Sequence, residues 1–236
     1  MKGIILAGGQ GTRLLPMTRV TNKHLLPVYD KPMIYYPIET LKHLGVTDIM
    51  IITGNESAGD FLNLLGDGSE FGVNFTFRIQ KKSNGIAGAL SLCEDFAGDN
   101  RIAVILGDNI FDNNAIDPVC CSANLGGMIF LKEVDDPERF GVAEIRLDKV
   151  ENIEEKPLNP KSNLVVTGLY IYDHNVWNVI RYLKPSDRGE LEITDVNNWY
   201  IEKCKMNYSL VEGFWSDAGT VPSLFTASMF ISTCEG

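Results

Sequence analysis

Hydrophobic residues in the first half of the chain follow two alternating patterns. Nearly continuous apolar runs end at Ala7, Thr53 and Leu106, and a further β-rich run ends at Gln80. Between these runs, apolar residues recur at helical spacing. Continuous apolar runs are typical of strands covered on both faces of a parallel sheet. The pattern predicts strands at Lys2–Ala7, Asp48–Thr53, Asn74–Gln80 and Arg101–Leu106, with helices at Met33–Leu44, Ser57–Leu65 and Ile86–Phe96.

The second half of the chain is richer in strand patterns. After Asp108, short β-rich runs follow one another with few helical patterns between them. These runs predict strands at Met128–Val134, Val142–Ile145, Lys149–Glu155, Val165–Tyr172 and Tyr208–Gly213, and helices at Val176–Leu183, Leu191–Lys203 and Val221–Phe230. The whole pattern predicts an α/β fold with a Rossmann-like, mainly parallel mixed sheet flanked by helices, and a second, strand-rich lobe.

Charge and composition argue against several functional classes. The net charge is −10 and the longest basic run is Lys81-Lys82, so we expect no nucleic-acid surface. No apolar run approaches the roughly 20 residues of a membrane-spanning helix, and the apolar start is too short for a signal peptide. The three histidines form no zinc pattern. The five cysteines lack C-x-x-C spacing, which indicates reduced thiols and a cytoplasmic location; they are Cys93, Cys120, Cys121, Cys204 and Cys234.

The densest chemical signal is the glycine loop Gly8-Gly9-Gln10-Gly11-Thr12-Arg13-Leu14, directly after the first strand. Glycines let the backbone approach a ligand and offer N–H groups to phosphate oxygens. The loop is not a P-loop, because no Gly-Lys-Ser/Thr follows at the required distance. Leu14 at the third glycine position also argues against a dinucleotide-binding fingerprint. On its own, the loop is equally well explained as a tight turn between a strand and a helix.

Charged residues beyond the loop indicate phosphate chemistry. Arg13 and Lys23 could hold one triphosphate from two sides, the first through a planar fork and the second as a point charge. The alternative is that both lie on a solvated surface. Asp108 follows the apolar strand that ends at Leu106, and ligands of open α/β sheets bind outside the carboxyl ends of strands. Asp217 is a second candidate ligand for Mg²⁺; taken alone, either aspartate could be a turn or cap residue.

The segment Gly8–Pro16, with Lys23 and Leu26-Pro27-Val28, resembles the signature of the sugar-phosphate nucleotidylyltransferases. Within that family, Val20–Pro27 is most similar to the glucose-1-phosphate thymidylyltransferases, and the similarity extends over nearly the whole chain. The resemblance implies Mg²⁺-dependent transfer of dTMP from dTTP to glucose 1-phosphate, giving dTDP-glucose for nucleotide-sugar biosynthesis such as the dTDP-rhamnose pathway. The alternatives are an enzyme that uses UTP or another sugar 1-phosphate, and a non-catalytic nucleotide-sugar sensor.

The resemblance also implies an assembly and a division of the chain. It implies a homo-oligomer, either a dimer or a tetramer, that associates with neither nucleic acid nor membrane. Many relatives continue past the Asp-Ala-Gly or Asp-Thr-Gly motif, so this chain is interpreted as a short form. Residues 1–236 would form one domain, with a nucleotide-binding lobe at 1–112, a sugar-phosphate-binding lobe at 113–216, and the metal-site aspartate with a closing helix at 217–236.

The resemblance assigns roles to individual residues. Arg13 and Lys23 would be catalytic, and Asp108 and Asp217 would hold Mg²⁺. The nucleotide-binding residues would be Leu6, Ala7, Gly8, Gly9, Gly11, Thr12, Arg13, Gln80, Gly85 and Asp108. The residues that bind the sugar phosphate would be Lys23, Asn109, Phe140, Gly141, Glu155, Lys156, Val166, Gly168 and Arg188.

Three positions bear on specificity. The Gln80 amide offers both a donor and an acceptor, which suits the imide edge of thymine or uracil but cannot separate the two bases. Relatives often have Gln where this chain has Gly88, and Gly should weaken the helix start by roughly 1 kcal/mol relative to Ala. Relatives often have Tyr where Phe140 stands, so the ring is kept and its hydroxyl is lost.

Overall fold

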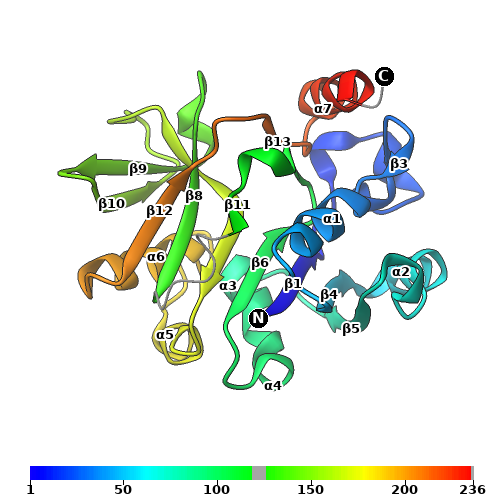
Figure 1. The fold of residues 1–236 in the computed structure, drawn as a ribbon, viewed down its shortest axis with the longest axis horizontal. Coiled ribbons are helices and arrows are strands. Elements are labelled where there is room, and N and C mark those ends of the chain that lie inside the picture. Colours follow the sequence, from blue (N-terminus) through cyan, green and yellow to red (C-terminus); the bar gives the residue numbers. More distant parts are fainter. Residues whose placement is uncertain (119–125, 235–236) are drawn as a thin grey trace.

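The centre of the molecule is a nine-stranded mixed sheet, seen in a computed structural model that describes residues 1–118 and 126–234 (Figure 1). Four parallel strands form its first half, in the order β6 (Ile102–Leu106), β1 (Lys2–Ala7), β4 (Asp48–Gly54) and β5 (Asn74–Gln80). Ile5 of β1 lies between Ile51 and Ile105 of its two neighbours. The predicted parallel strands are therefore confirmed, with β4 and β6 each differing by one residue at one end.

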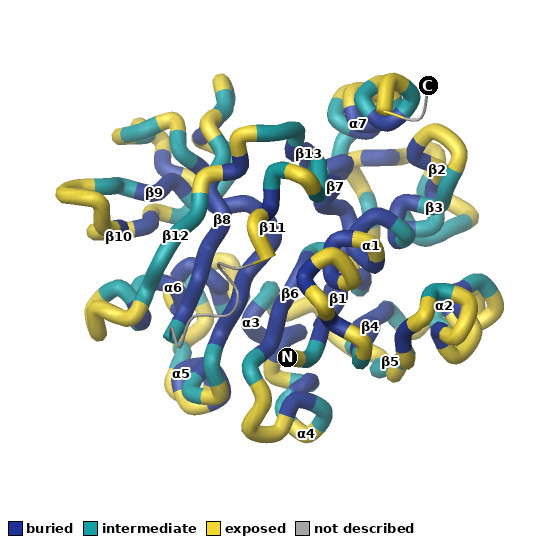
Figure 2. Tube along the Cα trace, in the orientation of Figure 1, coloured by how far each residue is buried: buried dark blue, intermediate teal, exposed yellow. Residues whose placement is uncertain are grey.

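Helices cover both faces of this half, which explains the continuous apolar runs. Ile4 and Leu6 pack in one cluster with α3 (Ile86–Leu90) and α4 (Glu94–Ala97), whereas Ile5 and Ala7 pack in another with α1 (Tyr35–His43) and α2 (Ala58–Leu65). Successive strand residues point to opposite faces, so each face needs its own apolar set. In Figure 2 the central strands are accordingly dark blue along most of their length.

The helix predicted over Ile86–Phe96 is divided in the structure. A 3₁₀ turn at Ser91–Cys93 separates α3 from α4. The hydroxyl of Ser91 donates to the carbonyl of Gly88, 2.8 Å away. A serine that bonds the backbone in this way competes with the regular helical pattern, which the apolar spacing alone does not reveal.

The second half extends the same sheet. β11 (Leu164–Tyr172) runs antiparallel to β6 and pairs along its length with β8 (Gly127–Glu133). β9 (Gly141–Arg146) and β10 (Lys149–Glu155) form a hairpin at one edge, and β12 (Met206–Leu210) lies parallel to β8. α5 (Val176–Tyr182) and α6 (Ile193–Glu202) pack on the face that also holds α3. The strand predicted at Tyr208–Gly213 begins and ends earlier, because its pairing with β8 starts at Met206.

Two short strand pairs were absent from the prediction. β2 (Pro27–Val28) pairs with β3 (Lys31–Pro32), and β7 (Asn109–Phe111) pairs with β13 (Trp215–Asp217). α7 (Val221–Cys234) closes the chain and packs its Leu224 and Ala227 in a small cluster with Val28 and Ile110. The β7–β13 pair places the end of the chain beside the carboxyl end of β6.

The structure bears on two predictions made from composition, the reduced cysteines and the absence of a membrane-spanning helix. The thiols of Cys93, Cys204 and Cys234 are unpaired, while Cys120 and Cys121 lie outside the described residues. Among the described helices, none combines the length and the apolar character needed to cross a bilayer.

Candidate active site

Lys23 and Asp108 meet at the carboxyl end of β6. The Nζ atom of Lys23 forms an ion pair with Oδ2 of Asp108, which is buried. The glycine loop makes room for the lysine: a Cβ on Gly9 would lie 3.2 Å from Cε of Lys23, and one on Gly11 would lie 2.8 Å from its Cβ. Gly11 also has φ +65°, a left-handed conformation that favours glycine. These two glycines therefore allow the loop to wrap around Lys23.

The charge of Asp108 depends on that contact. Burial by itself would raise the pKa of Asp108, but the neighbouring Lys23 cation and its hydrogen bond outweigh burial and hold the pKa well below its usual range. Asn109 adds a hydrogen bond from Nδ2 to Oδ1 of Asp108, at 3.1 Å. The carboxylate is therefore ionised over the whole physiological pH range.

A second carboxylate lies beside the first. Asp217 in β13 pairs with Asn109 in β7, and the N–H of Ala218 donates to the carbonyl of Asp108 at 2.8 Å. Burial is the main cause that raises the pKa of Asp217, the attraction of Arg139 opposes it, and the repulsion of Asp108 adds to it. The Nη2 atom of Arg139 lies 3.2 Å from Oδ2 of Asp217. The two aspartates are thus close enough to repel each other.

This pair of carboxylates fits a magnesium ion. Mg²⁺ usually takes one or two protein carboxylates and completes its octahedron with phosphate oxygens and waters. Two hard oxygen donors on neighbouring strands meet that requirement, and their mutual repulsion would be relieved by a cation. Within residues 1–118 and 126–234, no cluster of three or more His, Cys, Asp or Glu could enclose a metal. The geometry therefore suits an ion shared with a substrate rather than one held by protein alone.

Arg13 lies at the same place. A Cβ on Gly219 would lie 2.9 Å from Nη2 of Arg13 and 3.3 Å from Oδ2 of Asp108, so the guanidinium and the carboxylate approach one another across this glycine. Arg13 lies in a 3₁₀ turn, Thr12–Leu14, directly after the glycine loop. The structure therefore brings together four predicted site residues, Arg13, Lys23, Asp108 and Asp217.

Asn109 holds three elements together. Its Oδ1 accepts hydrogen bonds from the N–H of Gly168, at 2.8 Å, and from Nε1 of Trp215, at 2.7 Å. A Cβ on Gly168 would lie 2.6 Å from the Asn109 side chain, so this glycine allows close approach by asparagine. The pairing of β11 with β8 shifts between Val166 and Tyr170, which frees the Gly168 N–H for this bond. In this structure Asn109 joins β7 to β11 and β13.

The residues predicted to bind the sugar phosphate include a cluster around Glu155. Thr194 donates its hydroxyl to Oε2 of Glu155 at 2.6 Å. Oε1 of the same carboxylate lies 3.4 Å from Nη2 of Arg188 and 3.6 Å from Nζ of Lys156. Arg188 is also held by Glu192, with Nη2 2.9 Å from Oε2. These contacts hold a carboxylate and two cations beside the cavity.

A cavity of about 460 Å³ joins the two halves of the site. Predicted residues that line it are Arg13, Asp108, Asn109, Phe140, Gly141, Glu155, Lys156, Val166, Gly168 and Asp217. Predicted residues outside its lining are Leu6, Ala7, Gly8, Gly9, Gly11, Thr12, Lys23, Gln80, Gly85 and Arg188. Lys23 and Arg188 still contact lining residues through Asp108 and Glu155. Gly85 packs against the backbone of Leu191, and Gln80 against Gly8.

Sequence reasoning missed several lining residues. Arg139 bonds Asp217 and lies 5.0 Å from the ring centroid of Phe140, which in turn packs edge-on against Trp215. Thr194 and Glu192, at the start of α6, hold Glu155 and Arg188 in place. Arg139 directly precedes the predicted site residue Phe140, so its charge could have marked it as a further candidate.

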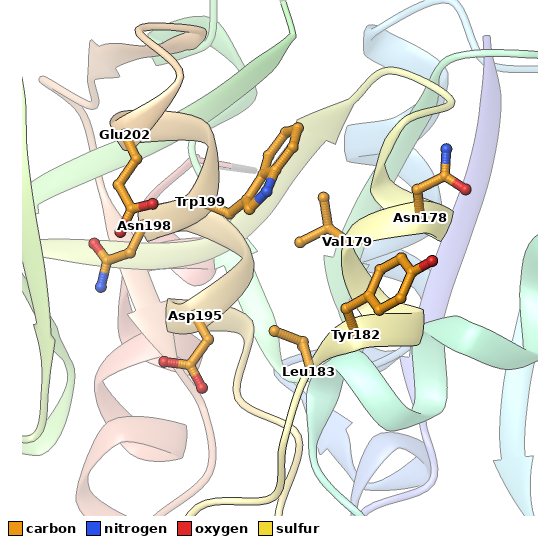
Figure 3. Close-up of a pocket in the computed structure, with 8 residues that line it drawn as sticks. All are labelled: Asn178, Val179, Tyr182, Leu183, Asp195, Asn198, Trp199 and Glu202. Atoms are coloured by element: carbon orange, nitrogen blue, oxygen red, sulfur yellow. The ribbon is translucent and has the colours of Figure 1, made fainter.

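A larger cavity lies elsewhere. It measures about 640 Å³ and opens between α5 and α6, with Trp199 on one helix facing Val179 on the other (Figure 3). Its lining is Asn178, Val179, Tyr182, Leu183, Asp195, Asn198, Trp199 and Glu202. None of these is a predicted site residue, and the lining contains no cation. The predicted site residues therefore gather at the smaller cavity and not at the larger one.

Comparison with known proteins gives consistent matches. A family model described as nucleotidyl transferase matches residues 2–233. A glucose-1-phosphate thymidylyltransferase of Neisseria meningitidis is 46% identical over 241 aligned residues, covering 100% of this chain and 84% of that protein. The enzyme of that name from Mycolicibacterium smegmatis is 45% identical, with 100% and 83% covered.

Solved structures agree with these relatives. A Bacillus anthracis structure, provisionally assigned as a glucose-1-phosphate thymidylyltransferase and solved with a sucrose, is 55% identical with a TM-score of 0.91, covering 98% of this chain and 94% of that one. A UDP-glucose pyrophosphorylase complexed with UDP-glucose is 25% identical with a TM-score of 0.86, covering 99% and 98%.

Proposed function

The chain belongs to the nucleotidyl transferase family, and we propose that it transfers dTMP from dTTP to glucose 1-phosphate, giving dTDP-glucose and pyrophosphate. The observation that carries the proposal is the meeting of Arg13 and Lys23 with Asp108 and Asp217 beside one cavity. The choice of dTTP and glucose 1-phosphate rests on the relatives of that name, which match the chain over its full length at 42–46% identity. The UTP-using alternative has weaker support, because the UDP-glucose enzyme is 25% identical.

The reaction needs no nucleophilic side chain. A phosphate monoester has a second pKa near 6 and is largely dianionic at pH 7, so its own oxygen can attack the α-phosphorus of dTTP. A new P–O bond forms there, the bond to the bridging oxygen of the β-phosphate breaks, and pyrophosphate leaves. The obstacle is repulsion between two anions, because two unit charges about 4 Å apart interact by about 4 kcal/mol at an effective dielectric constant of 20.

The cations of the site would offset this repulsion. Arg13 and Lys23 would bind the triphosphate, whereas Lys156 and Arg188 would bind the sugar phosphate from the other side of the cavity. Asp108 and Asp217 would hold Mg²⁺, which when bound neutralises phosphate charge at the reacting centre. Glu155, fixed by Thr194, would accept hydrogen bonds from sugar hydroxyls. Each role is a proposal for the named side chain.

We also propose the division of labour and the assembly that the sequence suggested. Residues 1–112 would bind the nucleotide, 113–216 the sugar phosphate, and 217–236 would supply the metal-site aspartate and the closing helix. A homo-oligomer is supported by α7, which carries no charged residue and exposes Val221, Phe225 and Met229 at intervals of four. The mass of the protein in solution, from light scattering, tests this part.

Pyrophosphate release by the purified protein tests the reaction. We would combine dTTP, UTP, CTP, ATP or GTP with glucose 1-phosphate and other sugar 1-phosphates in the presence of Mg²⁺. Release should be fastest with dTTP and glucose 1-phosphate, should stop with EDTA, and should return when Mg²⁺ is added in excess. Faster release with UTP would favour the alternative enzyme. Binding of dTDP-glucose with no release from any pair would support a sensor and would refute the proposed reaction.

A further inference from the structure

Two side-chain amides near the end of β5 lie next to two glycines, at a place where Gln80 is half-buried and Asn84 is exposed. The Nε2 atom of Gln80 donates a hydrogen bond to Oδ1 of Asn84, 3.1 Å away. A Cβ on Gly8 would lie 2.6 Å from Oε1 of Gln80, and a Cβ on Gly88 would lie 2.3 Å from Oδ1 of Asn84. A real Cβ does not come so close to another heavy atom, so each amide as placed needs a glycine beside it. We refer to Gly8, Gln80, Asn84 and Gly88 as the amide row.

Gly88 is needed for space rather than for its backbone conformation. It is buried within α3, and the three atoms nearest to its missing Cβ all belong to the side-chain amide of Asn84. Its φ is not in the positive range where glycine is favoured. Glycine is a poor helix former, so the chain loses helix stability at this position and gains room for Asn84.

The backbone of Asn84 is also fixed. Its carbonyl accepts a hydrogen bond from the N–H of Leu191 at 2.9 Å, and the carbonyl of Leu191 accepts one from the N–H of Ala87 at 3.2 Å. Gly85 has φ +90°, and a Cβ there would lie 2.4 Å from the Leu191 carbonyl oxygen. Asn84 is therefore held at its backbone and its side chain, and it can restrain the amide of Gln80.

This restraint decides which edge the Gln80 amide presents. A free glutamine amide can turn over and offer either its oxygen or its nitrogen at one place. With Nε2 bonded to Asn84, Oε1 remains on the side of Gly8 and is the acceptor that a ligand meets. Thymine and uracil carry an N–H at ring position 3, which can donate a hydrogen bond to such an oxygen. Cytosine carries a lone pair at the same place, which the oxygen repels.

We propose that Asn84 is a positioning residue for nucleobase selection, which holds the Gln80 amide ready to accept a hydrogen bond from an imide N–H, and that Gly88 leaves the room for it. The inference rests on the proposed function, because that function brings a pyrimidine nucleotide to Gln80. Asn84 then separates imide bases from cytosine. It does not separate dTTP from UTP, since both bases carry the same imide edge.

The test is a kinetic cycle with Asn84→Ala, Gly88→Ala and the double variant, each assayed with dTTP, UTP and CTP. Loss of one positioned hydrogen bond changes affinity by about five- to tenfold. We therefore expect KM for dTTP and for UTP to rise by about that factor in each single variant, with kcat within about twofold. The preference for dTTP over CTP in kcat/KM should fall by about tenfold, and the ratio of dTTP to UTP should not change. The double variant should be no worse than either single one, because all three lose the same contact.

Three controls separate positioning from damage to the fold. Gly59→Ala makes the same change in α2, where no atom lies within 4 Å of the new Cβ, and should leave all constants unchanged. Asn84→Asp keeps the accepting oxygen, so it should retain the preference for dTTP over CTP. Gly88→Ala should melt at or above the temperature of the parent protein, because Ala is the better helix former.

The outcomes are distinct. Parental KM values and parental preference in Asn84→Ala would overturn the inference, and so would losses that multiply in the double variant. If no pair of substrates gives pyrophosphate with the parent protein, the proposed function fails. The role of the amide row is then tested by measuring dTDP binding with calorimetry. Weaker binding in both single variants would then support the inference. Unchanged binding, or no binding by the parent, would overturn it.

Discussion

Lys23 and Asp108 form an ion pair whose members depend on each other. Their side chains are only 13% and 10% exposed, so each charge has lost most of its water. A buried charge that loses its partner is strongly unfavourable, whereas the intact pair keeps both groups ionised. At the scale of single residues, one contact therefore keeps both the proposed phosphate-binding cation and the proposed metal ligand in their charged forms.

Replacing Lys23 by Met tests this contact. The variant loses a cation aimed at the triphosphate, and the pKa of Asp108 should rise because burial is no longer opposed. We expect kcat for pyrophosphate release to fall by about 100-fold or more, the usual effect of removing one group that stabilises the transition state. Lys161→Met is the matched control, since Lys161 forms an exposed ion pair with Glu144. A kcat within threefold of the parent, in a folded variant, would contradict the assignment.

The residues of the site were not equally predictable. Arg13, Lys23 and Asp108 stand at fixed places in strand–loop patterns, so their types and spacing pointed to them. Arg139 could have been marked by its place next to Phe140, but its contact with Asp217, 78 positions away, has no local signal in the sequence. Within the amide row, Gly8 and Gln80 were predicted as site residues, whereas Asn84 was missed, because a glycine at position 88 reads as a weak helix residue until the side chain that fills its space is seen.

At the scale of elements, predictability followed length and burial. β1, β4 and β6 are covered on both faces, so each appears in the sequence as an unbroken apolar run. β7 and β13 have three residues each, too few to show any periodicity. Yet this pair sets Asp217 beside Asp108. The part of the fold that brings the two proposed metal ligands together was therefore the part that the hydrophobic pattern could not show.

Asn109 offers a test of how these short strands are held. Asn109→Ala would leave the N–H of Gly168 and Nε1 of Trp215 without their acceptor. Each buried donor left unpaired costs about 1–3 kcal/mol, so we expect the free energy of unfolding in urea to fall by about 2–5 kcal/mol. Activity at a temperature where the variant is folded should also fall, because Asp108 loses a positioning bond.

The comparison variant for this prediction is Asn152→Ala. Asn152 is exposed and donates to Glu144 at the surface, so its loss should change stability by less than about 0.5 kcal/mol. If Asn109→Ala were no less stable than Asn152→Ala, the bonds of Asn109 would not be what fixes β7 and β13.

At the scale of the whole molecule, an acidic protein gathers several cations at one cavity. The chain has a net charge of −10, yet Arg13, Arg139 and Lys156 all line the site. Four carboxylates line the same cavity, namely Asp108, Glu155, Glu192 and Asp217, and two of them pair with Arg139 and Lys156. One continuous sheet joins the parallel half to the strand-rich half through β6 and β11, so the cations of the two halves are fixed relative to each other.

Stability of this assembled core should depend on pH through His24. The ring is buried, with Nδ1 2.7 Å from Oδ1 of Asn22, and it lies beside Lys23. Burial is the largest cause that lowers the pKa of His24, and the Lys23 cation adds to it, bringing the pKa to about 3 from 6.5. The unfolded chain therefore binds a proton below pH 6.5 that the folded protein does not, and stability is lost as the pH falls from about 6.5 toward 3.

Between pH 7 and pH 5 this single histidine should reduce the free energy of unfolding by about 2 kcal/mol. In His24→Asn, which keeps a polar group near Asn22 but cannot take up the proton, the fall over that range should be smaller by about that amount. Urea denaturation of both proteins at the two pH values measures the difference, and contributions from other groups cancel in the comparison. His174→Asn removes an exposed ring and should reproduce the parental fall. If His24→Asn lost as much stability as the parent over this range, the His24 ring would already carry its second proton in the folded protein. The interpretation of His24 as a neutral core residue would then be wrong.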